Sequence, residues 1–111
     1  MDCLFCKIIE GEIPFDKLYE DDRVLAFKDI SAQAPEHFLV IPKEHISTLN
    51  DTDDAALLGQ LSLTAIQIAK ERGFAENGYR LAMNCNADGG QSVFHIHLHC
   101  LGGRKMAWPP G

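Results

Sequence analysis

The chain has 111 residues, 46% of them hydrophobic, and a formal net charge of −6. This length predicts a single domain, residues 1–111, that buries most of a hydrophobic core by itself. The acidic balance argues against binding to a nucleic-acid backbone, which requires a basic surface.

The same composition argues against a membrane or secreted protein. No apolar run approaches the roughly 20 residues of a membrane span, so we expect no membrane partner. The first seven residues lack the basic region and the long apolar run of a signal peptide. Four cysteines in such a chain are typical of reduced thiols or a metal site rather than a disulfide framework. We therefore predict a cytoplasmic protein.

The first half of the chain predicts a short helix and three strands. Residues 5–9 form a short amphipathic pattern that indicates a helix. Residues 17–20 and 23–29 predict two strands joined by an acidic turn, which is a hairpin. Residues 37–41 are an apolar run of strand length that ends at Pro42.

The second half predicts one long helix and further strands. Residues 52–54 supply an N-cap for a helix that runs to about Arg72, with Gly73 as its C-terminal stop. Four apolar residues fall on one face of this helix: Leu58, Leu61, Ala65 and Ile68. Residues 79–84 predict another strand, followed by a loop at residues 88–90. This pattern favours an α+β fold with a largely antiparallel sheet.

The most informative stretch is His95-Ile-His97-Leu-His99. Its histidines repeat at i, i+2 and i+4, which is the period of a β-strand. The three imidazoles would therefore lie on one face and the apolar residues Phe94, Ile96, Leu98 and Cys100 on the other. Imidazole can act as a base, an acid or a nucleophile near neutral pH, so this row predicts an active site. Two of these histidines could share a metal ion, but one straight strand is poorly suited to place three around it.

This segment resembles the His-x-His-x-His signature of the histidine-triad family of nucleotide hydrolases and transferases. The likeness extends over nearly the whole chain, and four further motifs resemble the Hint branch of purine nucleoside phosphoramidases: Tyr19-Glu-Asp-Asp-Arg, Phe27-Lys-Asp-Ile-Ser, Ala34-Pro-Glu-His-Phe-Leu-Val-Ile-Pro-Lys and Trp108-Pro-Pro-Gly. The resemblance implies a five-stranded antiparallel sheet with one long and one short helix on one face. It also implies a homodimer in which the tail, residues 102–111, extends toward the partner's site.

The resemblance also implies an activity. It predicts hydrolysis of the P–N bond of purine nucleoside 5′-phosphoramidates, such as AMP joined to lysine or other amines, through a nucleotidyl-histidine intermediate. Purine nucleotides such as AMP and GMP, and their amine conjugates, are then the partners, and catalysis requires no cofactor. The alternatives are a dinucleoside polyphosphate hydrolase of the same fold and a non-catalytic zinc- or nucleotide-binding regulator.

Roles for single residues follow from the matching motif positions. His97 is expected to be the nucleophile, His99 to contact the phosphate, and His95 to hold the edge of the site. His37 is expected to set the tautomer of His97 and to pass a proton. Ser92 and Asn84 are expected near the phosphate and the leaving group, with Gln91 beside them. Asp29 is expected to bind the ribose, and apolar residues to line the base: Phe5, Ile8, Phe27 and Ile30.

Cys3-x-x-Cys6 departs from many Hint-branch members. Other branches of the family hold a structural zinc on two such cysteines and two histidines, and the matching positions are His45 and His95. A Cys2His2 zinc site is chemically sound and would attach the N-terminal segment to the sheet. Packing cysteines and a thioredoxin-like redox pair are the other interpretations.

Overall fold

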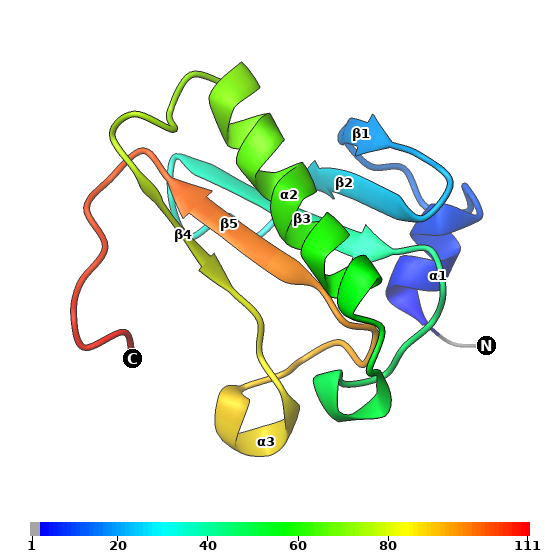
Figure 1. Cartoon of the computed structure of the whole chain (residues 1–111). Helices are drawn as coiled ribbons and strands as arrows, with labels where there is room; N and C mark the ends of the chain where they lie inside the picture. Colours follow the sequence, from blue (N-terminus) through cyan, green and yellow to red (C-terminus); the bar gives the residue numbers. More distant parts are fainter. Residues whose placement is uncertain (1–2) are drawn as a thin grey trace.

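The computed structural model describes residues 3–111, which form one five-stranded sheet with helices around it (Figure 1). The strand order is β1-β2-β3-β5-β4, and every neighbouring pair is antiparallel. The strands are β1 Lys17–Glu20, β2 Val24–Lys28, β3 Glu36–Pro42, β4 Tyr79–Ala82 and β5 Leu98–Gly102. The predicted α+β class and the predicted five-stranded antiparallel sheet are confirmed.

The long helix α2 spans Ala55–Glu71 and lies across one face of the sheet (Figure 1). It begins where the Asp54 carboxylate accepts a hydrogen bond from the Leu57 N–H at 3.0 Å. It ends before Gly73, whose φ of 84° is the left-handed conformation that glycine adopts at little cost. The buried residues follow the helical period: Leu57, Leu61, Ala65, Ile68 and Ala69. The predicted bounds are close to those observed, and Leu61, Ala65 and Ile68 are buried as predicted, but Leu58 is only partly buried and Leu57 is buried instead.

The short helix α1 spans Leu4–Ile9 and packs on the opposite face of the sheet. Its Phe5 and Ile8 are buried against the apolar residues of β2 and β3 that point away from α2. The expectation that both helices share one face is therefore wrong. The reason is visible in β2 and β3, whose apolar residues are continuous rather than alternating, so both faces of the sheet centre must be covered.

The histidine segment is a strand only in its second half, because β5 begins at Leu98. Before it, the Ile96 N–H donates to the Ile46 carbonyl at 2.8 Å instead of joining the sheet. The neighbouring strand β3 ends at Pro42, which has no N–H to extend the ladder. The alternation nevertheless persists: Ile96, Leu98 and Cys100 lie in the core under α2. Phe94 was expected in that core, but its side chain is 50% exposed.

Two short elements were not predicted. The helix α3 spans Asn86–Gly89, where a loop was expected, and Gly90 follows it in a left-handed conformation. The 3-10 turn η1 spans Leu49–Asp51 and is held by a capping box between Thr48 and Asp51. The expectation of one long and one short helix is corrected by the addition of α3. Both elements are single turns, too short to leave a periodic apolar pattern in the sequence.

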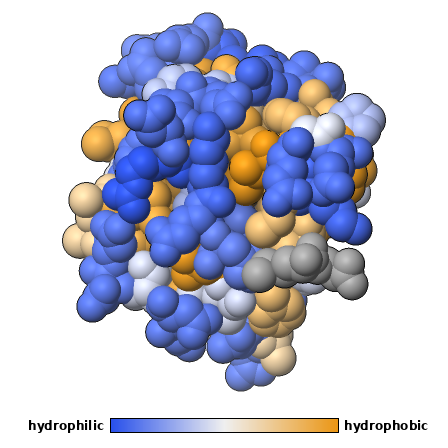
Figure 2. Space-filling view, turned by 90° about the vertical axis from the view of Figure 1, so that its right-hand side faces the viewer, coloured by the Kyte–Doolittle hydropathy of each residue, from blue (hydrophilic) through white to orange (hydrophobic). Residues whose placement is uncertain are grey.

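The surface is mixed, and the C-terminal tail is an exposed segment without helix or strand. Seen from the right-hand side of Figure 1, the surface is largely hydrophilic, with apolar patches between polar ridges (Figure 2). Along the described chain, none of the helices combines the length and the hydropathy needed to cross a bilayer. The tail leaves β5 and runs beside β4 (Figure 1), where Arg80 donates to the Ala107 carbonyl at 2.9 Å. The expected cytoplasmic location stays a prediction.

Candidate active site and metal centre

His97 presents one free ring nitrogen because its other nitrogen is engaged. Its Nδ1 lies 2.8 Å from the carbonyl oxygen of His95. A carbonyl oxygen only accepts hydrogen bonds, so Nδ1 carries the proton and donates it. The neutral ring then has an unprotonated Nε2, which is the lone pair that a nucleophile or a base requires. The ring is buried and packs edge-on against Phe5, with centroids 5.1 Å apart.

His37 and His99 form a hydrogen-bonded pair next to His97. The Gln33 N–H donates to His37 Nδ1 at 3.0 Å, so the proton of the neutral His37 ring lies on Nε2. That Nε2 donates to His99 Nδ1, also at 3.0 Å. The neutral His99 ring therefore keeps its own proton on Nε2. His97 and His99 thus offer opposite functions, since one has a free Nε2 lone pair and the other an Nε2–H donor.

Burial keeps the rings of His37 and His99 neutral. Desolvation, followed by the positive fields of His97 and His37, lowers the pKa of His99 to about 4. Desolvation also lowers the pKa of His37, although the nearby Asp29 carboxylate opposes this effect. At pH 7 both rings are uncharged, and the hydrogen-bonding pattern of the neutral tautomers applies.

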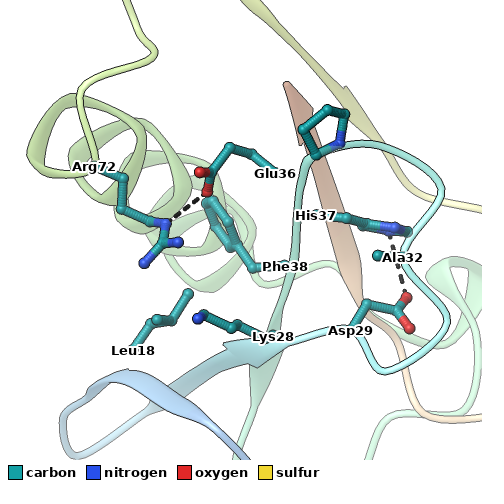
Figure 3. Close-up of a pocket in the computed structure, with 9 residues that line it drawn as sticks. Leu18, Lys28, Asp29, Ala32, Glu36, His37, Phe38 and Arg72 are labelled. Atoms are coloured by element: carbon teal, nitrogen blue, oxygen red, sulfur yellow. Dashed lines mark hydrogen bonds and ion pairs between the residues drawn. The ribbon is translucent and has the colours of Figure 1, made fainter. Parts of the chain in front are cut away.

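Asp29 lies at the end of β2 and points toward His37. Its Oδ2 is 3.4 Å from His37 Nε2 (Figure 3). Its Oδ1 accepts the Ser31 N–H at 2.8 Å. The turn from residue 29 to residue 37 thus holds both the carboxylate and the imidazole through its backbone amides. Because these bonds come from the backbone, the arrangement depends on how the turn is folded rather than on the side chains within it.

A cavity of about 310 Å³ connects the histidines with an apolar wall. Its polar lining comes from three separate parts of the chain and consists of Lys28, Asp29, Ser31, Ser92, His97 and His99. The apolar lining includes the expected base-binding residues Phe5, Ile8, Phe27 and Ile30. Ile30 is 99% exposed, so it stands at the mouth and does not close the wall. A ligand with a flat apolar group and an anionic group matches such a lining.

A second cluster joins α1 to the histidine segment. Cys3 Sγ and Cys6 Sγ lie 3.4 and 3.6 Å from His95 Nδ1, and Cys6 Sγ lies 3.4 Å from His45 Nδ1. All four donor atoms are within 4.8 Å of one another. A tetrahedral zinc site with Zn–S of about 2.3 Å and Zn–N of about 2.0–2.1 Å has sulfur–nitrogen edges of roughly 3.6 Å. The observed separations therefore fit a metal ion at the centre.

The surroundings of this cluster fit a metal as well. His95 Nε2 donates to the Pro42 carbonyl at 2.8 Å, which leaves the Nδ1 lone pair directed at the two thiols. His45 Nε2 faces the Ser47 hydroxyl at 3.3 Å. Burial, reinforced by the hydrogen bond and charge of Cys3, raises the pKa of Cys6 to about 11, so a bound cation would displace the proton of this thiol.

Asp29, His37 and His99 also gather three donor atoms within 4.8 Å, but their hydrogen bonds do not suit a metal. His37 Nδ1 already accepts from the Gln33 N–H, so the ring proton occupies Nε2, the atom that faces the other two residues. Metal binding at Nε2 would require an imidazolate or the loss of that backbone bond. This trio is better described as a hydrogen-bonded chain.

Residues 10–106 match the HIT domain. This chain belongs to the HIT family. It is 53% identical to an uncharacterized HIT-like protein of Synechococcus elongatus, covering 99% of this chain and 97% of that protein. It is 52% identical to the purine nucleoside phosphoramidase of Escherichia coli K12, covering 93% of this chain and 88% of that enzyme.

Solved structures agree with this assignment. The HIT family hydrolase from Legionella pneumophila superposes with a TM-score of 0.96 at 54% identity, covering 99% of this chain and 100% of that one. A histidine triad protein from Clostridium difficile gives a TM-score of 0.93 at 50% identity, with 96% and 95% covered. The resemblance inferred from the sequence is confirmed at the level of the family.

Several residues expected in the HIT site do not line the cavity described above. Gln91 is buried, and its amide donates to the carbonyls of Ser47 at 2.7 Å and Val93 at 3.1 Å. Its Oε1 accepts from the Asn86 N–H at 2.9 Å, so this side chain holds the loop together. His95 is fully buried and faces the cysteine cluster. Asn84 packs beside Gly89 and does not line the cavity.

The expected partner of His37 is corrected. His37 was expected to set the tautomer of His97, but its Nε2 contacts His99, and the carbonyl of His95 fixes the His97 tautomer. The reason is the sheet register, which pairs His37 with Leu101 and Leu39 with His99. His37 therefore lies nearer to His99 than to His97.

Several contributors to this HIT site were not predicted from the sequence, among them Gln33 and Leu4. Gln33 acts only through its backbone N–H, which no side-chain pattern can reveal. Leu4 lies at the cavity mouth, one turn before Ile8 on the same face of α1. The i, i+4 spacing of these two apolar residues was the available signal.

Proposed function

We propose that this chain hydrolyses the P–N bond of purine nucleoside 5′-phosphoramidates, including AMP joined to lysine. The observation that carries the proposal is the pair of opposite tautomers, because a free Nε2 on His97 stands beside an Nε2–H on His99 at one cavity. The name and 52% identity of the Escherichia coli phosphoramidase support the substrate class. Purine preference is taken from that relative.

In the proposed reaction, His97 Nε2 attacks phosphorus and the P–N bond breaks, which produces a nucleotidyl-His97 intermediate. The departing amine needs a proton, and in this proposal it comes through the hydroxyl of Ser92, which lines the cavity. The His99 Nε2–H would donate to a non-bridging oxygen as negative charge develops there. Water then attacks phosphorus, the bond between phosphorus and His97 Nε2 breaks, AMP is released, and the proton from the water returns to Ser92. The net reaction consumes one water and yields an amine and AMP.

Incubation with AMP-lysine tests this proposal through the release of AMP, measured by chromatography. Diadenosine polyphosphate serves as the comparison substrate, since a hydrolase of that class would turn it over faster. Binding of AMP without turnover of either compound would instead favour the regulator. Faster release of AMP from AMP-lysine than from the diadenosine compound is the expected result.

We also propose that the Cys3, Cys6, His45 and His95 cluster binds a metal ion and that this ion is zinc. Two thiolates and two imidazoles in a tetrahedral arrangement are the donor set that zinc prefers. When bound, the ion would neutralise the thiolates and hold α1 on the sheet. The proposed chemistry at phosphorus uses His97 and does not pass through this ion.

Finally, we propose that the chain works as a homodimer. The strand β4 lies at the edge of the sheet, and Trp108 in the tail beyond it is 81% exposed. A large aromatic side chain in this position is typical of a contact surface. Sedimentation or light scattering at micromolar concentration measures the mass directly, and twice the chain mass of 12.3 kDa is expected.

A further inference from the structure

One proton on His37 has two competing acceptors. His37 Nε2 lies 3.0 Å from His99 Nδ1 and 3.4 Å from Asp29 Oδ2. Because Gln33 donates to Nδ1, the neutral ring has only this single N–H to offer both neighbours. Figure 3 shows the Asp29 carboxylate directed at the His37 ring. The carboxylate therefore draws the same proton that would otherwise bond fully to His99.

The two acceptors belong to different parts of the site. His99 lines the cavity beside His97, whereas Asp29 lines it from the end of β2, beside Ile30. Asp29 already accepts the Ser31 N–H at Oδ1, so its remaining acceptor capacity faces the cavity and His37. Hydroxyl groups that donate to this carboxylate reduce its pull on the His37 proton, since each hydrogen bond to an acceptor weakens the next.

We infer that Asp29 couples ribose binding to the phosphate chemistry by controlling which acceptor receives the His37 Nε2–H. This inference rests on the proposed function, in which the Asp29 carboxylate binds the ribose hydroxyls. When the hydroxyls occupy the carboxylate, His37 donates fully to His99 Nδ1. That bond polarises the His99 ring and strengthens its Nε2–H as a donor to the reacting phosphoryl group. Asp29 is thus a positioning residue as well as a ligand of the sugar.

The coupling predicts that substrate hydroxyls affect kcat as well as KM. A carboxylate that only binds the sugar would discriminate against substrates without hydroxyls through KM. A carboxylate coupled to His99 discriminates through kcat as well, because the donor to the phosphoryl group is weaker when the hydroxyls are missing. The chain would then select ribonucleoside phosphoramidates over 2′,3′-dideoxy analogues at the chemical step.

The charges around this chain of groups predict how it responds to a substitution. The titratable neighbours of His37 are Asp29 and His99. The titratable neighbours of His99 are His37 and His97. The Asp29 charge raises the pKa of both His37 and His99 against the lowering effect of burial. Asp29→Asn removes this charge and keeps a side chain of similar size. The acid limb of the kcat profile is therefore expected to move to lower pH in this variant.

The experiment measures kcat and KM for adenosine 5′-phosphoramidate and its 2′,3′-dideoxy analogue. In the wild-type chain we expect kcat to fall by about threefold or more when the hydroxyls are removed. In Asp29→Asn we expect kcat to be nearly the same for both substrates, with its acid limb at lower pH. Asp53→Asn is the matched control, because it makes the same substitution at an exposed carboxylate outside the cavity lining, and it should behave as the wild type.

A second readout does not depend on turnover. The 15N shifts of His37 and His99 at pH 7 report which acceptor holds the shared proton. These shifts should differ between the wild-type chain and Asp29→Asn, and between wild-type complexes with AMP and with 2′,3′-dideoxy-AMP.

The two readouts separate the coupling from the proposed function. Equal kcat values for both substrates, with only KM changed, would overturn the coupling and leave the phosphoramidase function intact. Absent turnover with the expected 15N changes would overturn the function and keep the link from Asp29 to His99. If Asp29→Asn does not fold, the comparison of the two nucleotides in the wild-type chain still decides the question, and identical shifts would reject the coupling.

Discussion

At the level of single residues, three histidines of one segment differ because their ring nitrogens meet different partners. The Nδ1 of His97 donates to a carbonyl, the Nδ1 of His99 accepts from His37, and the Nδ1 of His95 faces two thiols. The same side chain therefore offers a free lone pair at His97, a hydrogen-bond donor at His99 and a candidate metal ligand at His95. The role open to each histidine depends on its tautomer, and the partner of its Nδ1 determines that tautomer.

His97→Ala tests the assignment of the nucleophile. The variant should fold and bind AMP, but kcat for AMP-lysine should fall by about 100-fold or more, because no neighbouring ring offers a free Nε2 in its place. Steady-state assays and calorimetry with AMP measure the two quantities. Leu63→Ala, on the exposed side of α2, is the control and should keep the wild-type rate. Retention of more than about a tenth of kcat, a barrier change below ~1.4 kcal/mol, would contradict the assignment.

At the level of elements, the helix α1 links the cysteine cluster to the substrate cavity. Cys3 is the N-cap of this six-residue helix, and its Sγ accepts the Cys6 N–H at 3.3 Å. Phe5, between these cysteines, packs against both His95 and His97. A helix of this length is not stable by itself in water. Its position, and with it one wall of the cavity, therefore depends on packing and on the cluster.

Metal analysis and thermal unfolding test the role of the cluster. A tag-free sample should contain about one zinc per chain, and removal by a chelator should lower Tm by about 5 °C or more, because ligand binding energy is lost from the folded state. Cys3→Ser should reproduce this loss. Cys85→Ser is the control, since Cys85 lies outside the cluster, and it should retain zinc. A metal-free sample with freely titratable Cys3 and Cys6 thiols would favour packing cysteines.

The tail is the second element whose removal is informative. Residues 107–111 contact the rest of the described chain through Arg80, which donates to the Ala107 carbonyl and lies 5.9 Å from the Trp108 ring centroid. These contacts are exposed, so deletion of the segment should change Tm little. We expect kcat/KM to change by unequal factors for substrates with different amines, because the tail would reach the leaving group in the proposed dimer. Steady-state kinetics on two such substrates measures the effect. If the deletion changes kcat/KM by the same factor for both substrates, the tail does not contact the leaving group.

At the level of the whole molecule, buried neutral histidines make stability depend on pH. The unfolded chain protonates His99 near its ordinary pKa of 6.5, whereas the folded chain does so near 4. The unfolded state therefore binds more protons in this interval, and the free energy of unfolding decreases as the pH falls. This contribution is complete above pH 6.5 and is lost by about pH 4, with a magnitude of up to about 3 kcal/mol.

Urea unfolding between pH 7 and pH 4.5 measures this effect. A chelator should be present throughout, so that loss of metal does not contribute to the slope. His99→Gln should reduce the slope, because glutamine has no ionisable group, while His37 and His95 should continue to contribute in the same direction. An unchanged slope in this variant would show that His99 is not desolvated in the folded state.

Much of this architecture follows from local patterns in the sequence. The 3.6-residue period and the caps at Asp54 and Gly73 determine α2, and the apolar runs at residues 24–27 and 38–41 determine the central strands. The alternation of histidine and apolar residues placed the imidazoles on the face opposite α2, even where the segment is not a strand. These signals act over a few residues, so they can be interpreted without the fold.

The roles of the site residues depend on long-range contacts. The pairing of His37 with His99 follows from the register between β3 and β5, and the position of α1 follows from the two-sided apolar centre of the sheet. The backbone amide of Gln33 sets a tautomer without any side-chain signal. The sequence by itself therefore determined which chemical groups the site contains. Only the folded structure decided which nitrogen of each ring is free, because a tautomer depends on the atom that each nitrogen faces, whether that atom is two residues away, as for His97, or across the sheet, as for His99.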